Sequence, residues 1–182
     1  MHDKKNCRWI CPDTGTEYDL SHMADMTLSF NVMLKKGEEP VSFPCRVEFH
    51  NHCYTRGRKE GDTDEQVFIA EKRRGGEIEE RVFCPERWDY SLRLPEILRN
   101  IVFKDCLQGD RKEILFRQED RPDASSLKGW YLCMRFDYRK DLDPKLILRI
   151  NSCHWRPNRP DGVRGGPKRF LMLLAQFLRK RL

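Results

Sequence analysis

Three histidines stand at positions where they could act together on a phosphate group. His50 and His52 are two residues apart in the stretch Val41–Tyr54, whose pattern favours a strand, so we expect both side chains on one face. His154 follows a later strand, directly after Ser152 and Cys153. Histidine can accept or donate a proton near neutral pH. If the two strands are neighbours in one sheet, these residues predict a site for proton transfer.

Arginines surround these histidines in the sequence, and Arg87, Arg149 and Arg156 are the candidates for binding phosphate. A guanidinium group can bind two oxygens of one phosphate. Cleavage of RNA through its own 2′-hydroxyl needs a base, an acid and cations around the phosphorus, but no metal. The combination therefore predicts a metal-independent endoribonuclease that needs no cofactor.

Three short segments of the sequence also resemble a known protein family. The segment Phe49–Thr55 (FHNHCYT), the segment Arg81–Pro95 and the strand ending Asn151-Ser152-Cys153-His154 resemble an uncharacterised bacterial family of small stand-alone proteins. Through it the chain is similar to the barnase- and RelE-like ribonuclease superfamily, whose members include toxins and phage-defence enzymes. The resemblance covers residues 28 to 156.

The resemblance implies that residues of two strands and one helix face a single catalytic cleft. His154 stands where the superfamily pattern leads us to expect an aromatic hydroxyl, so the acid or base is in question, and the chain could bind RNA without cutting it. The catalytic candidates are His52, Thr55, Arg87, Ser91, Ser152 and His154.

A zinc site is the main alternative for the same segment. Cys45, His50, His52 and Cys53 place four potential ligands within nine residues. On a regular strand the two histidines share one face and the two cysteines the other, so the four could converge only at a bulge or a turn. In that case the chain would be a zinc-stabilised subunit of a larger complex.

The positive charge is concentrated in the last quarter of the chain. From Arg139 to Leu182 there are twelve Lys or Arg against three Asp, whereas the first 138 residues hold twenty-three basic and twenty-six acidic side chains. Such a field favours a polyanion, and nucleic acid is the commonest one. A non-catalytic nucleic-acid-binding or regulatory adaptor module fits this charge as well. The binding candidates are Arg149, Arg156, Arg159, Arg164, Lys168 and Arg169.

The alternation of apolar and polar residues predicts an α+β fold with one mostly antiparallel twisted sheet, packed by a central helical segment and a C-terminal helix. Residues 1–24 lack periodicity and are expected to form an irregular arm before a single domain of residues 25–182. The expected strands are Met26–Leu34, Val41–Tyr54, Val67–Ala70, Ile114–Arg117, Trp130–Tyr138 and Leu146–Ser152. The expected helices begin at Cys84-Pro85, with a break near Pro95, and at Pro167.

Length, composition and the absence of certain motifs limit the number of domains and the class of protein. A chain of 182 residues fits one domain, and no apolar run reaches the roughly 18 residues that a membrane span needs. Without an export signal we expect a soluble cytoplasmic protein with reduced cysteines. Phosphate-binding Gly-x4-Gly-Lys, Gly-x-Ser-x-Gly and His-Glu-x-x-His motifs are absent from the sequence, which argues against nucleotide hydrolases, serine hydrolases and zinc peptidases. The apolar stretch Phe170–Leu178 is expected to pack on the core or to contact a protein partner.

Overall fold

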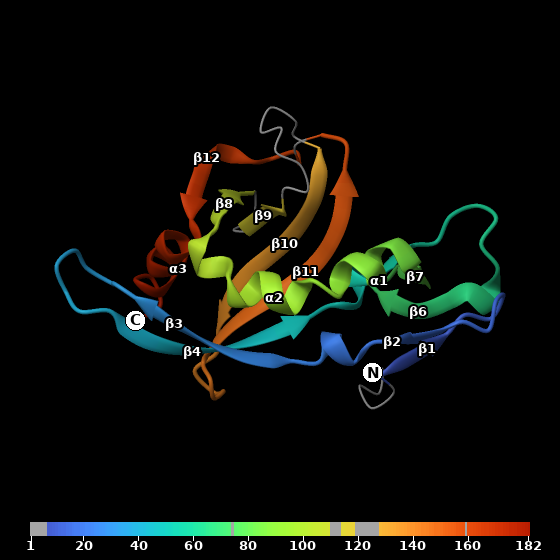
Figure 1. The fold of residues 1–182 in the computed structure, drawn as a ribbon, viewed down its shortest axis with the longest axis horizontal. Coiled ribbons are helices and arrows are strands. Elements are labelled where there is room, and N and C mark those ends of the chain that lie inside the picture. The colour runs from blue at the N-terminus through green and yellow to red at the C-terminus, as the bar shows by residue number, and fades with distance from the viewer. Residues whose placement is uncertain (1–6, 74, 110–113, 119–127, 159) are drawn as a thin grey trace.

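The computed structural model describes residues 7–73, 75–109, 114–118, 128–158 and 160–182 (Figure 1). Its strands form three sheets. The large sheet has the order β12-β8-β9-β10-β11-β4-β3, a smaller one has the order β5-β7-β6, and β1 pairs with β2.

The bounds of the strands in the large sheet are as follows: β3 Met26–Val32, β4 Val41–Phe49, β8 Asp105–Gln108, β9 Ile114–Gln118, β10 Gly129–Tyr138, β11 Leu146–Arg156 and β12 Arg164–Arg169. The other two sheets consist of β1 Arg8–Ile10, β2 Glu17–Asp19, β5 Thr55–Gly57, β6 Val67–Lys72 and β7 Ile78–Phe83.

The two faces of the large sheet differ in chemistry because residues alternate along each strand. In β4, Cys45 and Val47 are fully buried in the apolar core, while Arg46 and Glu48 point to the other face. In β11, Leu148 is likewise a core residue and its neighbour Arg149 is not. One face therefore builds the core, and the opposite face carries charged groups.

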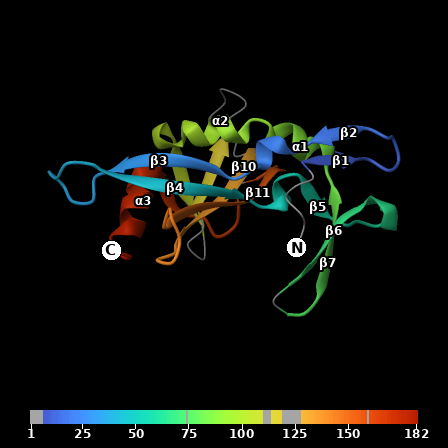
Figure 2. The same cartoon turned by 90° about the horizontal axis from the view of Figure 1, so that it is seen from below.

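Helices α1 (Pro85–Ser91), α2 (Leu94–Arg99) and α3 (Phe170–Leu178) supply the other half of the core. Proline stands in the first turn of both α1 and α2, where its missing N–H costs nothing. Leu94, Leu98, Phe170 and Leu174 are all fully buried against the sheet. Figure 2 shows α1 and α2 along one side of the molecule and the β6–β7 hairpin projecting from the other.

The expected fold class is wrong. The described strands lie in three separate sheets and contain more residues than the short helices, and the large sheet includes the parallel pair β4–β11. Six strands were not predicted, namely β1, β2, β5, β7, β8 and β12, and four of them have only three or four residues. The two longest, β7 (IEERVF) and β12 (RGGPKR), carry no regular alternation of apolar and polar residues. Their pairing with β6 and β8 holds them in extended conformation.

Three other predicted segments differ from the structure in their bounds or their conformation. The strand predicted for Val41–Tyr54 stops at Phe49, where the chain turns into the 3-10 turn η2 (Asn51–Cys53). The last helix begins at Phe170, because Lys168 and Arg169 pair with β8 at the end of β12. The N-terminal arm contains the β1–β2 hairpin, whose aromatic rings Trp9 and Tyr18 pack on Phe83.

Other predictions are confirmed. Strands stand at the places expected for β3, β6, β9, β10 and β11, and the helical segment is divided just before Pro95. In the part of the chain that is described, no helix has the length and apolar character needed to cross a membrane.

Candidate functional site

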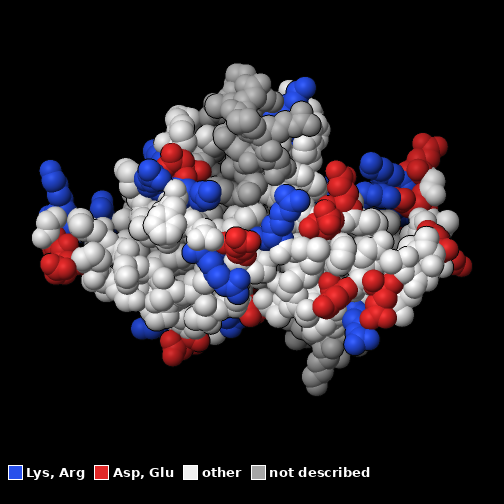
Figure 3. Space-filling view, viewed as in Figure 1, with Lys and Arg blue, Asp and Glu red and all other residues white. Residues whose placement is uncertain are grey.

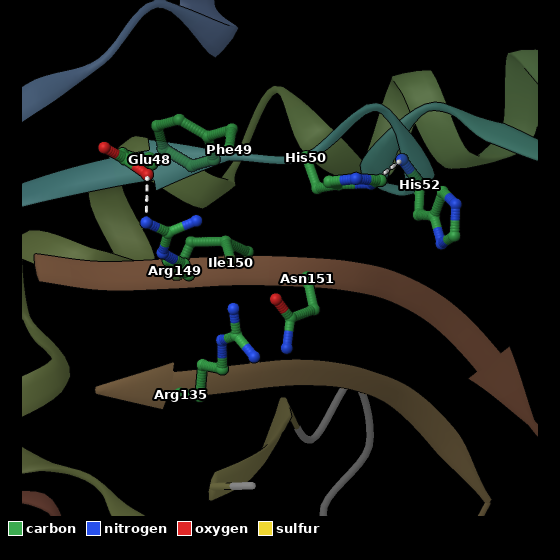
Figure 4. A pocket seen from close by; sticks show the side chains of 8 residues that line it. All are labelled: Glu48, Phe49, His50, His52, Arg135, Arg149, Ile150 and Asn151. Carbon is green, nitrogen blue, oxygen red and sulfur yellow. Dashed lines mark hydrogen bonds and ion pairs between the residues drawn. The ribbon is translucent and has the colours of Figure 1, made fainter. Parts of the chain in front are cut away.

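A cavity of about 490 Å³ opens where β4 leaves β11. The two strands run in parallel as far as Phe49, and the N–H of His50 then donates to the carbonyl of Ile150 at 2.9 Å. Beyond this bond the chain turns into η2, so a gap lined by side chains of β4, β10 and β11 is left (Figure 4). The cavity is lined by Glu48, Phe49, His50, His52, Arg135, Arg149, Ile150 and Asn151.

Two arginines stand directly opposite each other in this wall. Arg135 of β10 pairs with Arg149 of β11, so both guanidinium groups project from one face of the sheet. Arg149 lies 3.6 Å from Glu48 and 3.5 Å from Asp137, whereas Arg135 is exposed and forms no ion pair with the described residues. Like charges at opposite positions repel each other, and a bound anion would relieve this repulsion.

A β-bulge directs a further polar side chain into the cavity. Cys133 pairs with Ser152 while Met134 pairs with Ile150, so Asn151 is an extra residue in β11 without a partner in β10. Figure 4 shows the side chains of Asn151 and Arg135 pointing toward one another. The bulge therefore places an amide next to the arginine pair.

The turn η2 brings two histidines to one carboxylate. His52 Nε2 lies 3.2 Å from Glu71 Oε2, and His50 Nε2 lies 3.8 Å from Glu71 Oε1. The centres of the two imidazole rings are 4.4 Å apart, and the rings are nearly perpendicular. The amide of Asn51 donates to Glu71 Oε1 at 2.6 Å. Because the chain turns here, three consecutive residues reach the same side chain of β6.

The environment sets the protonation of this group. Burial lowers the pKa of His52 to about 4, helped by the positive charge of Arg81 and opposed by Glu71. Burial also lowers the pKa of His50. Burial by itself raises the pKa of Glu71, but hydrogen bonds from Asn51 and His52 outweigh it, so the net shift is downward. At neutral pH both rings are uncharged and Glu71 is ionised, so Nε2 of His52 donates to Glu71 and Nδ1 holds the free lone pair.

The second histidine site on β11 has a different character. His154 Nδ1 lies 3.4 Å from Ser152 Oγ, and Arg156 Nε donates to His154 Nε2 at 2.5 Å. Burial, followed by the charges of Arg156 and Arg87, lowers the pKa of His154 to about 4. Since Arg156 uses the lone pair of His154, this ring has no free acceptor for a substrate proton.

Two of the remaining catalytic candidates support η2. Thr55 is fully buried, and its hydroxyl donates to the carbonyl of Asn51 at 2.9 Å. Arg87 Nη1 donates to the carbonyls of His52 at 3.1 Å and Thr55 at 2.7 Å. Arg81, which is 4% exposed, donates to the hydroxyl and carbonyl of Thr55 and to Glu79. These contacts fix the backbone that carries His50 and His52.

Ser91 lies apart from the cavity. Its side chain is fully buried, and its hydroxyl contacts the carbonyl of Trp88 and the ring of His22, both at 2.7 Å. Of the six catalytic candidates, therefore, only His52 lines the cavity.

The cysteines of the alternative zinc site do not join the histidines. Cys45 and Cys53 are both fully buried, and burial raises the pKa of the Cys45 thiol to about 12 and that of Cys53 well above its usual range. Cys53 donates to the carbonyl of Ile150. Within the described residues, the potential metal ligands that come together are His50, His52 and Glu71. No sequence motif points to Glu71, which lies on β6.

The residues expected to bind nucleic acid do not lie together in the structure. Arg149 lines the cavity and Arg156 contacts His154. Lys168 and Arg169 lie on the edge strand β12, where they contact Gln108 and Asp105 respectively. Arg159 and the side chain of Arg164 lie outside the described residues. On the face shown in Figure 3, basic and acidic side chains are interspersed.

These features define a mostly β protein with a polar cavity that combines two cationic side chains with a histidine–glutamate pair. The chain belongs to the YjaZ family, whose model matches residues 7–178. No curated protein and no solved structure matched the chain. The family match agrees with the expected membership of an uncharacterised bacterial family and provides no link to the barnase- and RelE-like superfamily.

Proposed function

We propose that the protein binds RNA at this cavity and cleaves it by attack of the RNA's own 2′-hydroxyl, without a metal. The observation that carries the proposal is the pair Arg135 and Arg149, which stands in the same cavity as His52. Phosphate is the anion best matched to paired guanidinium groups, since each can bind two of its oxygens. A role as a toxin or in phage defence would follow from this activity.

Binding of a phosphate would use the two arginines differently. Arg135 is exposed and can turn toward a ligand, whereas Arg149 is held near Glu48 and Asp137. Arg149 therefore supplies a fixed positive charge and Arg135 an adaptable one. The amide of Asn151, which lines the same cavity, can donate to a phosphate oxygen or a base.

Proton transfer is assigned to His52 because Glu71 orients its ring. In the proposed reaction His52 Nδ1 takes the proton of the 2′-hydroxyl while that oxygen bonds to phosphorus. The bond from phosphorus to the 5′-oxygen breaks, and this oxygen takes a proton from a water molecule. That water is in turn reprotonated by the His52 imidazolium, which restores the neutral ring. The products are a 2′,3′-cyclic phosphate and a 5′-hydroxyl. Glu71, which accepts the Nε2 proton of His52 at 3.2 Å, stabilises the imidazolium that forms.

The test is cleavage of a labelled single-stranded RNA in the presence of EDTA. We expect the wild-type chain to give fragments that end in cyclic phosphate, and His52→Ala to lose about 10² to 10⁴ in rate, as is typical of a general base. The control is His154→Gln, which changes a histidine outside the cavity. Absence of cleavage by the folded wild-type chain, or an unchanged rate in His52→Ala, would contradict the proposal.

A second candidate is binding of nucleic acid without turnover. It is favoured by the contacts of Thr55, Arg87 and Ser91, which use these candidate catalytic groups to hold the backbone or another side chain. In that case RNA affinity falls steeply with salt and the bound RNA is recovered intact.

A further inference from the structure

We propose that His50, His52 and Glu71 also bind one divalent transition-metal ion of the zinc class, and that this ion prevents His52 from acting as a base. The metal site stands on the geometry of the three side chains. Its inhibitory effect rests on the proposed function.

The three ligand atoms already lie close to the arrangement that a metal needs. One ligand atom from each residue can be chosen so that all three lie within 4.8 Å of one another. Tetrahedral zinc with bonds of about 2.0 to 2.1 Å separates its ligands by about 3.4 Å. His52 Nε2 lies 3.2 Å from Glu71 Oε2 and His50 Nε2 lies 3.8 Å from Glu71 Oε1, so each imidazole already lies near this separation from one oxygen of the carboxylate.

The chemistry of the ligands also fits this class of ion. Two imidazoles and one carboxylate are a common zinc set in which water completes the coordination. Sites of this kind need supporting hydrogen bonds, and here the amide of Asn51 holds Glu71 Oε1 at 2.6 Å. The nearby positive charge of Arg81 is balanced by Glu79 at 2.8 Å.

The two parts of the site, the turn that carries the histidines and the strand that carries Glu71, are held independently. His50 and His52 flank Asn51 on η2, whose backbone is fixed by Arg87 and Thr55, while Glu71 belongs to β6 of the smaller sheet. A metal ion would therefore join the end of β4 to the smaller sheet. Its binding would stabilise the fold as well as occupy the cavity.

Metal binding and proton transfer by His52 exclude each other for a simple reason. A neutral imidazole has one proton and two nitrogens. Without metal, Nε2 carries the proton toward Glu71 and Nδ1 has the lone pair. A metal on Nε2 moves that proton to Nδ1, and no proton is released. The ring then has no lone pair for the 2′-hydroxyl proton.

The metal site is tested without RNA. The full chain, freed of metal with a chelator and dialysed, is titrated with Co²⁺ while visible absorption is recorded, and with Zn²⁺ by calorimetry. We expect one ion per chain, and loss of this binding in His50→Ala and Glu71→Ala. Cys45→Ala and His154→Gln are the controls that should retain it, and circular dichroism verifies that each variant is folded. No binding by wild type, or unchanged binding in His50→Ala, overturns the proposed site.

Inhibition is tested separately in the cleavage assay. We expect saturating Zn²⁺ to reduce cleavage by wild type to the level of His52→Ala, with recovery on adding EDTA. Any cleavage that remains in His50→Ala should no longer respond to zinc. If cleavage requires the metal, the inhibitory effect and the metal-free mechanism both fail, while the site stands. If metal binds but RNA is never cut, the proposed function fails and the site again stands.

Discussion

Replacing Arg135 by alanine tests whether the cavity binds phosphate. Arg135 is exposed, faces Arg149 across the β10–β11 pair and has no ion pair among the described residues, so its removal leaves no carboxylate unpaired. A hydrogen bond that involves a charged group contributes about 1.5 to 3 kcal/mol. Because Arg135 is exposed, we take the lower limit for its contact. Since about 1.4 kcal/mol is a factor of ten, we expect roughly tenfold weaker RNA binding in Arg135→Ala.

The assay for this prediction is fluorescence anisotropy with a short single-stranded RNA at several salt concentrations. Each phosphate contact contributes about −0.7 to the slope of log affinity against log salt for single strands, so the slope should become shallower by about this amount. Arg139→Ala is the matched control, because Arg139 lies beyond the end of the same strand and pairs with Asp141. Equal affinities and slopes for wild type and Arg135→Ala would refute the proposed phosphate contact.

Three other predictions concern the fold around the site. Arg81→Ala should lower the free energy of unfolding by about 3 kcal/mol in urea titration, since it removes a nearly buried partner of an ion pair and the hydrogen bonds to Thr55; a change below about 1 kcal/mol would contradict this role. His154 has a pKa lowered to about 4, so the unfolded chain binds its proton first and wild-type stability falls as pH drops from about 6.5 to about 4. His154→Gln should show a weaker fall over that range, and identical pH profiles would argue against a half-buried neutral ring. Iodoacetamide at pH 8 should modify the exposed Cys7. Cys45 should stay unreacted until the chain is unfolded, because it is buried and its thiol pKa is raised to about 12. Mass spectrometry of the native protein measures this, and modification of Cys45 would contradict the prediction.

The alternation of apolar and polar residues and the positions of prolines predicted several strands and the first two helices correctly. The alternation in Met26–Val32 and Gly129–Tyr138 and the prolines at α1 and α2 were sufficient to place strands and helices. The turn at η2 was not visible, because the residues from His50 to Tyr54 continue the alternation of a strand. The turn is held by hydrogen bonds to its backbone from Arg87 and Thr55, and the partner in the bond from Arg87 is set by the tertiary fold.

In the candidate site, too, some residues could be predicted from the sequence and others only from the tertiary structure. His52 was expected from its type and its neighbour His50, and it lines the cavity. Glu71 and Arg135 were not expected, because neither follows a motif and each reaches the site from another strand, Arg135 through the β10–β11 pair and Glu71 through its side-chain contact from β6. Arg87 was expected as a phosphate ligand, but its Nη1 donates to the backbone carbonyls of His52 and Thr55. The residue types alone suggested histidines and arginines as candidates. Which of them lie together at the cavity became clear only from the fold.

The most direct measurement of the central claim compares an RNA with its 2′-O-methyl counterpart of the same sequence, both incubated with wild-type protein in EDTA. Both carry the same phosphates, so both should bind to Arg135 and Arg149. Only the RNA has the hydroxyl from which His52 can take a proton. We predict that the RNA is cut to cyclic-phosphate ends and the methylated strand is bound but intact. Cleavage of both strands, or of neither, would contradict the account.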